Sequence, residues 1–189
     1  MKVLFLDNDG VICLFNNWGG RFRKQKKYEG DLTTPNCPVE ARFDDFDKKA
    51  IKVLNRILEE TGAEIVVSSD WRKKATLEEL GQYYLDQGIT KAPIDFTPEY
   101  KDIDDEGLRF RWRRDRYSEQ ERAAEIKSWL KDHPEITHWV AVDDLNMGEL
   151  SLWGDKRDWG LTNFVLTPID TEGIKQTGKA KKIIEFLEG

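Results

Sequence analysis

Two aspartates follow a short apolar stretch near the start of the chain, in the segment KVLFLDNDGVI. Asp7 and Asp9 are separated by one residue, and extended backbone directs residues i and i+2 to the same side. Their carboxylates can therefore face one small volume, whereas Asn8 points elsewhere. Two carboxylates this close repel each other unless a cation or a shared proton lies between them. The spacing predicts such a site, and Gly10 allows the chain to turn away sharply.

Polar side chains also end two later apolar stretches. Ser68 and Ser69 follow residues 64–67, and Asp143 and Asp144 end the segment HWVAVDD. Ligands in open α/β sheets bind beyond the carboxyl ends of the strands. Each pair alone is explained by ordinary turn or helix-capping chemistry. Their coincidence with the first pair of aspartates favours one shared site.

The elements that must position these residues alternate between strand and helix along the chain. This alternation predicts a doubly wound, Rossmann-like α/β domain, in which helices cover both faces of a parallel sheet, and one domain over residues 1–189. Apolar runs predict strands at 3–6, 64–67, 138–144 and 163–168. Apolar residues at helical spacing predict helices at 46–60, at 76–87, from a capping box of Ser118 and Glu121 onward, and in a last segment ending near Leu187.

Two stretches, about 14–45 and 89–117, are too long for ordinary connections in such a fold, and both are basic. We expect small insertions here that form a cap. The period-two pattern of LRFRWRR predicts a cap strand whose arginines meet an anionic substrate, such as a nucleotide or an RNA end, beside aromatic rings. The alternative is a solvated surface balanced by the acidic run 102–106. The basic residues are Arg21, Arg23, Lys24, Lys26 and Lys27, then Arg109, Arg111, Arg113, Arg114 and Arg116.

Composition excludes several classes of protein. The net charge of −6 argues against a sequence-independent nucleic-acid binder. Cys13 and Cys37 form neither a disulfide framework nor a metal-site spacing, which is typical of structural thiols in a reducing compartment. No stretch approaches the length of a membrane span. We expect a soluble, cytoplasmic protein without a membrane partner, and the sequence does not indicate an oligomeric state.

The motifs resemble those of the haloacid dehalogenase (HAD) superfamily, in its phosphatase branch. FLDNDGV is similar to the first motif of that superfamily, IVVSSDWR to the second, and WVAVDD to the paired aspartates of the fourth. ERAAEIKSWL supplies the basic residue that precedes the fourth motif. More narrowly, SSDWR, RAAEIKSWL and WVAVDD resemble the HAD domains of Swiss Army Knife RNA repair proteins. The resemblance covers most of the chain.

The resemblance implies a phosphatase that works through an aspartyl-phosphate. Asp7 would attack phosphorus, and Asp9 would act as general acid and then as general base. A Mg²⁺ ion would be held by the Asp7 carboxylate, the Asp9 carbonyl and Asp143, with Asp144 bound directly or through water. Gly10 would lie beside the substrate. A catalytically idle module that binds phosphate or nucleic acid on the same fold is the alternative function.

The resemblance also implies groups that hold the phosphoryl oxygens. Ser68 would be one, together with a basic side chain. Arg122 is the first candidate for this base, because Arg122-x-x-x-Ile126 matches the family spacing and lies near the start of its helix. Lys127 is the second candidate, and a solvated helix charge is the alternative for it.

Three residues that follow Ser68 are candidates for substrate contacts or for structural roles. Ser69 would contact the phosphate or cap the following helix. Arg72 would bind a second substrate phosphate or form a surface ion pair. Trp71 is expected to pack in the core rather than to offer a stacking surface. The substrate is expected to be a phosphorylated small molecule, a nucleotide or a nucleic-acid end.

Overall fold

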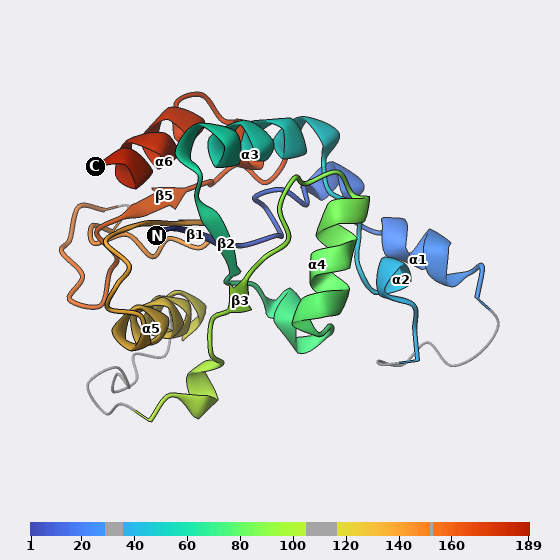
Figure 1. Cartoon of the computed structure of the whole chain (residues 1–189), viewed down its shortest axis with the longest axis horizontal. Helices are drawn as coiled ribbons and strands as arrows, with labels where there is room; N and C mark the ends of the chain where they lie inside the picture. Colours follow the sequence, from blue (N-terminus) through green and yellow to red (C-terminus); the bar gives the residue numbers. More distant parts are fainter. Residues whose placement is uncertain (29–35, 105–116, 152) are drawn as a thin grey trace.

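Among the residues that the structure describes, five parallel strands form one sheet in the order β3-β2-β1-β4-β5 (Figure 1). The computed structural model describes residues 1–28, 36–104, 117–151 and 153–189. The order and the parallel pairing confirm the doubly wound α/β fold. The strands are β1 (Lys2–Leu6), β2 (Glu64–Val67), β3 (Asp95–Phe96), β4 (His138–Asp143) and β5 (Phe164–Leu166).

Helices cover both faces of the sheet, with α5 on the side opposite to α3 and α6 (Figure 1). The α-helices are α1 (Gly20–Gln25), α2 (Val39–Arg42), α3 (Lys48–Thr61), α4 (Leu77–Asp86), α5 (Tyr117–Asp132) and α6 (Lys179–Glu188). Short 3₁₀ turns are η1 (Phe15–Asn17), η2 (Asp70–Lys73), η3 (Tyr100–Asp102) and η4 (Gly173–Lys175).

The central strand β1 is apolar on both faces, as expected for a strand buried in a parallel sheet. Leu4 and Leu6 belong to the core cluster that includes side chains of α3, α4 and α6. Val3 and Phe5 belong to the second cluster, which includes side chains of α5. Because side chains alternate along a strand, the residues after β1 are also directed alternately toward the two faces.

Helix α3 begins and ends at capping residues that agree with its apolar pattern. Its N-cap, Asp47, accepts hydrogen bonds from the backbone amides of Lys49 and Ala50 at 3.0 and 2.8 Å. Gly62 ends the helix with a positive φ of 68°, a conformation that glycine adopts without strain. The helix predicted at 46–60 is confirmed, although it begins two residues later, at Lys48.

The capping box predicted at Ser118 is wrong, because α5 already begins at Tyr117 and Ser118 lies inside it. The capping box that the structure contains is at the start of α4. There the backbone amide of Glu79 donates to Thr76 Oγ1 at 3.2 Å, and the Thr76 amide donates to Glu79 Oε2 at 3.0 Å. The Glu79 carboxylate also binds Arg42, with contacts of 2.8 and 3.0 Å.

The two stretches in which insertions were expected contain regular structure. Elements η1, α1 and α2 lie within 14–45, and strand β3 lies within 89–117. Strand β3 has only two residues, too few for a periodic signal in the sequence. The cap strand expected in LRFRWRR, with its arginines, lies outside the described residues. The cap itself stays a prediction.

Within the described part of the chain, no helix combines the length and the apolar composition that crossing a membrane requires.

The position of the capping box gives a stability prediction. We expect Thr76→Ala to lower the free energy of unfolding by about 1 kcal/mol, because the first turn of α4 loses an amide acceptor. Ser118→Ala is the matched control and should change it by less than about 0.5 kcal/mol, because this side chain is exposed within a helix. Urea unfolding followed by circular dichroism measures both. A larger loss for Ser118→Ala would contradict this assignment.

Candidate active site

The polar residues that follow β2, β1 and β4 lie side by side in one row. Ser68, Asp7 and Asp143 occupy equivalent positions, because the residues just before them are paired across the sheet. The backbone hydrogen bonds continue into this row: Ser68 N donates to the carbonyl of Leu6 at 2.9 Å, and Asp7 N donates to the carbonyl of Val142 at 3.1 Å. Three strands far apart in sequence thus place a hydroxyl and two carboxylates together.

The row lies where the winding of the sheet reverses. From β1 the chain proceeds to β2 and β3 on one side, then returns across the sheet to β4 and β5 on the other. Strands β1 and β4 are therefore neighbours with connections that leave in opposite directions. In open α/β sheets this switch point is where ligands bind, outside the carboxyl ends of the strands.

The turn after β1 is organised by Asn8. Its backbone carbonyl accepts from the amides of Val11, Ile12 and Cys13 at 3.3, 3.0 and 2.8 Å. Its side chain points to the face opposite Asp7 and accepts a hydrogen bond from the buried hydroxyl of Tyr84, on α4. Asn8 therefore points away from Asp7, as predicted, but not from Asp9, whose carboxylate is bound by Trp71 in the same core as Tyr84.

Gly10 is required at its position for two independent reasons. Its φ of +70° is unfavourable for residues with a Cβ. A Cβ here would also lie 2.4 Å from Asp144 Oδ2, which is closer than atoms approach without displacement. Gly10 therefore lies against Asp144, and its missing side chain leaves room for the Asp144 carboxylate.

Three carboxylates gather at this edge of the sheet. Asp7, Asp143 and Asp144 each offer an oxygen within 4.8 Å of the others, and the first two are buried. Burial raises the pKa of Asp7 to about 7, Arg122 opposes this, and Asp144 and Asp9 add to it. Burial also raises the pKa values of Asp143 and Asp144.

Arg122, the first candidate base, reaches this cluster from the second turn of α5. Its Nη1 atom lies 3.2 Å from Asp7 Oδ1 and 3.3 Å from Asp143 Oδ2, and it also donates to the carbonyl of Ser68. Its pKa stays above the usual range of arginine despite burial, because Asp143, Asp7 and other acids surround it. One guanidinium thus contacts all three positions of the row.

Lys127, the second candidate base, does not reach the cluster. Its Nζ donates to the carbonyl of Trp159 at 2.8 Å. It lies more than one helical turn beyond Arg122, on another part of the α5 surface. The lysine is therefore tied to the loop between β4 and β5, rather than to the row of polar residues.

Asp9 lies close enough to Asp7 for its charge to raise the pKa of Asp7. Its own pKa is raised by burial, and a hydrogen bond from Trp71 opposes this shift. The indole Nε1 of Trp71 donates to Asp9 Oδ2 at 2.8 Å. Nothing in the sequence indicated this contact, because the two residues are 62 positions apart.

The two serines after β2 are almost completely buried. Within the described residues, neither hydroxyl has a hydrogen-bond partner of ordinary geometry, although Ser69 lies near enough to Asp7 to lower its pKa. Ser69 precedes η2 without capping it through its side chain, so the capping alternative is wrong. Buried hydroxyls without partners are costly, and a ligand would satisfy them.

Arg72 occupies a different place from the one expected. Its Nη2 atom lies 2.7 Å from Glu125 Oε1 in an ion pair whose side chains are 3% and 7% exposed, and its Nη1 donates to the carbonyl of Ser69 at 2.9 Å. The prediction of a surface ion pair is therefore wrong, since the pair that Arg72 forms is buried. A contact to a second substrate phosphate is not supported either, because the guanidinium holds α5 to the loop after β2.

Glu125 was missed as a member of the site. It lies three residues after Arg122 on α5, and its Oε2 is 3.6 Å from Arg122 Nε. It also accepts from the backbone amide of Tyr100 at 2.9 Å. The i,i+3 spacing to Arg122 was the available signal. Glu125 joins both arginines and so fixes the position of the base.

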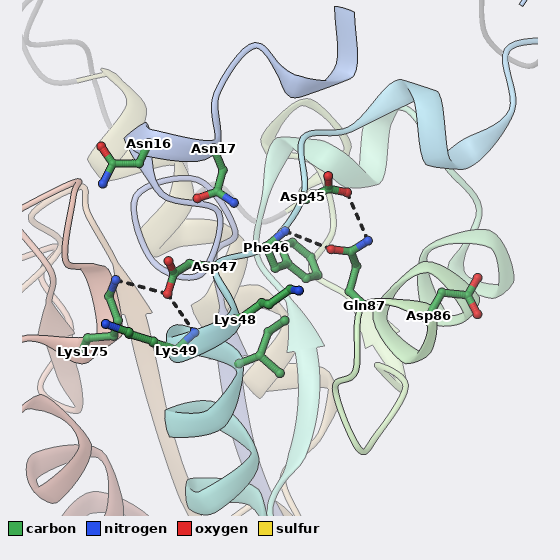
Figure 2. A pocket seen from close by; sticks show the side chains of 11 residues that line it. Asn16, Asn17, Asp45, Phe46, Asp47, Lys48, Lys49, Asp86, Gln87 and Lys175 are labelled. Atoms are coloured by element: carbon green, nitrogen blue, oxygen red, sulfur yellow. Dashed lines mark hydrogen bonds and ion pairs between the residues drawn. The ribbon is translucent and has the colours of Figure 1, made fainter. Parts of the chain in front are cut away.

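A polar depression is lined by residues other than those of the row (Figure 2). Its wall joins η1 to the start of α3 and the end of α4. Lys175 lies 3.1 Å from Asp47 Oδ1, and Gln87 bonds both Asp45 and the amide of Phe46 at 3.2 and 3.1 Å. The charges of the lining lysines and aspartates compensate each other, and these residues are Lys48, Lys49, Lys175, Asp45, Asp47 and Asp86. None of the residues of the row contributes to it, and it carries no chemistry of its own.

This fold and site define a HAD-type α/β domain, with an Asp-x-Asp-Gly motif at the switch point of a parallel sheet. The chain belongs to the family described as the HAD domain in Swiss Army Knife RNA repair proteins, whose model matches residues 3–175. No curated protein and no solved structure gave a match.

The acidic cluster has the chemistry of a Mg²⁺ site. Mg²⁺ prefers hard oxygen ligands and binds through a few carboxylates while it keeps several waters. Asp7, Asp143 and Asp144 supply such oxygens, and Arg122 alone does not neutralise three carboxylates. The Asp9 side chain is directed to Trp71 and does not belong to this cluster, and a metal contact through its backbone carbonyl stays a prediction.

The raised pKa of Asp7 gives a prediction about stability. A carboxyl with a pKa of 3.8 in the unfolded chain and about 7 in the folded protein takes up a proton on folding between these values. The metal-free protein should therefore lose stability as the pH rises through this range. Millimolar Mg²⁺ should raise the unfolding midpoint at pH 7.5, since it binds only the folded state.

The control for this prediction is Asp143→Asn, in which Mg²⁺ should shift the midpoint much less. Thermal unfolding in chelator and in Mg²⁺ measures both proteins over the same pH range. An identical midpoint with and without the metal in the wild-type protein would rule out this cluster as a Mg²⁺ site.

Proposed function

We propose that this protein is a Mg²⁺-dependent phosphomonoesterase that forms an aspartyl-phosphate on Asp7. The observation that carries the proposal is the row at the sheet edge, where the buried Asp7 carboxylate lies between Ser68 and Asp143. Arg122 contacts both carboxylates and the backbone carbonyl of Ser68, and the Ser68 hydroxyl has no hydrogen-bond partner among the described residues. A nucleophile, groups for phosphoryl oxygens and metal ligands are then within reach of one phosphorus atom. Membership of the HAD family supports the same reaction class.

The reaction has two steps. The Asp7 carboxylate attacks phosphorus and the ester P–O bond breaks, while Asp9 gives its proton to the departing oxygen. A water molecule then attacks the aspartyl-phosphate and loses a proton to Asp9, which releases inorganic phosphate and restores both carboxyl groups. Bound magnesium supplies positive charge to the phosphoryl group.

Ser68, Ser69 and Arg122 are the groups that would hold the phosphoryl oxygens during both steps. The guanidinium provides several donors in a fixed plane, which suits an anion with three equivalent oxygens. It is also held by Glu125, so it does not need to reorganise when charge develops.

We infer that the substrate carries a flat ring, as in a nucleotide or at a nucleic-acid end. Phe15, Trp18 and Phe22 are 53%, 44% and 55% exposed, which is unusual for three large apolar side chains so close in sequence. The Trp18 indole donates to the carbonyl of Cys13 at 3.3 Å, and the charge of Arg21 lowers the pKa of Asp9. Exposed aromatic rings and an arginine beside a phosphate site suit a base that stacks.

Both cysteines are free and buried, which supports the proposal that the protein works in a reducing cytoplasm.

The first test concerns the two aspartates of the motif. Asp7→Asn should abolish hydrolysis of a generic aryl phosphate, because the nucleophile is lost. Asp9→Asn should lower the turnover of an alkyl phosphate by about 10²-fold or more, because the departing oxygen receives no proton. Release of inorganic phosphate in Mg²⁺ measures both, with circular dichroism to show that the variants fold. Binding of a phosphorylated ligand by a wild-type protein without turnover would favour the idle binding module.

The second test separates the two candidate bases. Arg122→Ala should lower turnover by about 10²–10³-fold, because a fixed charge at the phosphoryl group is lost. Lys127→Ala is the matched control on the same helix and should stay within a few-fold of the wild type. Steady-state kinetics on one substrate measures both variants. A greater loss for Lys127→Ala would contradict the assignment.

The third test concerns the exposed rings. Trp18→Ala should lower kcat/KM for a nucleoside monophosphate by about 10-fold relative to that for glycerol phosphate, because one stacking contact is lost. Trp18→Phe should restore most of this preference, since it keeps a ring. Competition between the two substrates gives the ratio directly. An unchanged ratio in Trp18→Ala would show that the ring does not meet the substrate.

A further inference from the structure

Asp9 is held by a contact that the proposed reaction does not itself require. Trp71 Nε1 donates to Asp9 Oδ2 at 2.8 Å, and Trp71 is only 5% exposed. An indole N–H can donate a hydrogen bond but cannot accept one. Oδ2 must therefore remain an acceptor while this contact persists. The carbonyl oxygen of a protonated carboxyl is a better acceptor than its hydroxyl oxygen, so this contact favours the Asp9 proton on Oδ1.

The direction of this N–H group is fixed by neighbouring rings. The indole stacks on Phe43, with ring centroids 4.3 Å apart and planes 9° apart, and on Phe46, at 5.3 Å and 15°. The Tyr83 ring lies against the same indole with a centroid distance of 6.1 Å. These partners are buried, so rotation of the indole would need several core side chains to move.

We propose that Trp71 is a positioning residue for the general acid: its N–H holds Asp9 Oδ2, so that Oδ1 alone exchanges the proton with the departing oxygen. This inference rests on the proposed phosphatase reaction and extends it. The proton from Oδ1 goes to the ester oxygen as the P–O bond breaks, and Oδ1 takes a proton from water in the second step. No additional reactant is needed.

The positioning role specifies a class of substrate. Protonation matters most when the departing oxygen is strongly basic, as in an alkoxide from a sugar or another aliphatic alcohol. It matters little for a nitrophenolate, which departs as an anion. A protein that fixes the acid through a buried aromatic stack is suited to alkyl phosphomonoesters, whose leaving group is the hydroxyl of a sugar or similar alcohol.

The test uses Trp71→Phe, which removes the N–H and keeps a ring in the stack. The measured quantity is kcat/KM, which reports the first step, for glycerol phosphate and for nitrophenyl phosphate with Mg²⁺. We expect the ratio of the two values to fall by about 10-fold in favour of the aryl substrate, within the contribution of general acid catalysis. An unchanged ratio, with or without equal losses on both substrates, would overturn the positioning role.

Trp129→Phe is the matched control. Trp129 is also buried, and its Nε1 donates to Asp95 Oδ2 at 2.6 Å, on the other face of the sheet. Its loss removes the same type of hydrogen bond without involving Asp9 or Trp71. The substrate ratio should therefore stay at the wild-type value, whereas a fall equal to that of Trp71→Phe would assign the effect to folding.

A second readout does not depend on activity. The Trp71 indole proton, assigned by the loss of its NMR signal in Trp71→Phe, should exchange slowly with solvent and become faster in Asp9→Ala. Rapid exchange in the wild-type protein would overturn the hydrogen bond. A wild-type protein without turnover of either substrate would instead overturn the proposed phosphatase function, while slow exchange that becomes faster in Asp9→Ala would still establish the contact.

Discussion

The candidate site depends on the register of three neighbouring parallel strands. Both faces of β1 are apolar, so alternation of side chains alone would tolerate a shift by one residue. A shift would, however, draw Asp7 into the paired part of the strand, where an unpaired charge is costly. The transition from apolar to polar residues at the end of each strand therefore fixes the register, and the register places Ser68 and Asp143 on either side of Asp7.

Charge is the second constraint on this row. Buried carboxylates raise one another's pKa values, and Arg122 compensates only part of their repulsion. Removal of one partner of a buried ion pair leaves an uncompensated charge. Loss of the Arg122 side chain would therefore lower the free energy of unfolding substantially. The remaining negative charge is what a divalent cation would neutralise. A site that is electrostatically incomplete in the protein alone is therefore suited to bind both a metal and a phosphoryl group, whose charges complement each other.

Local patterns in the sequence predicted the motifs, the main strands and the longer helices, because these depend on periodicity and on residues close in the chain. Contacts between distant residues could not be predicted in this way. Strand β3 is too short for a periodic pattern, and the Ser118 box failed because the helix starts before it. Arg72 was expected at the surface, since its partner Glu125 lies 53 positions away and only tertiary packing brings the two together.

The two aspartates of the motif are supported from opposite faces of the sheet, and this separates their roles. Asp7 is held by Arg122, on the side of α5, and lies among the groups that would bind a phosphoryl group and a metal in the proposed reaction. The Asp9 carboxylate is held by Trp71, which belongs to the aromatic core on the other side. A carboxylate between Arg122 and a bound metal would be ionised and able to attack, whereas Asp9, which contacts a neutral indole, would take up and release a proton. The two carboxylates are close in the chain, but their side chains contact different cores, which would give them different chemistry.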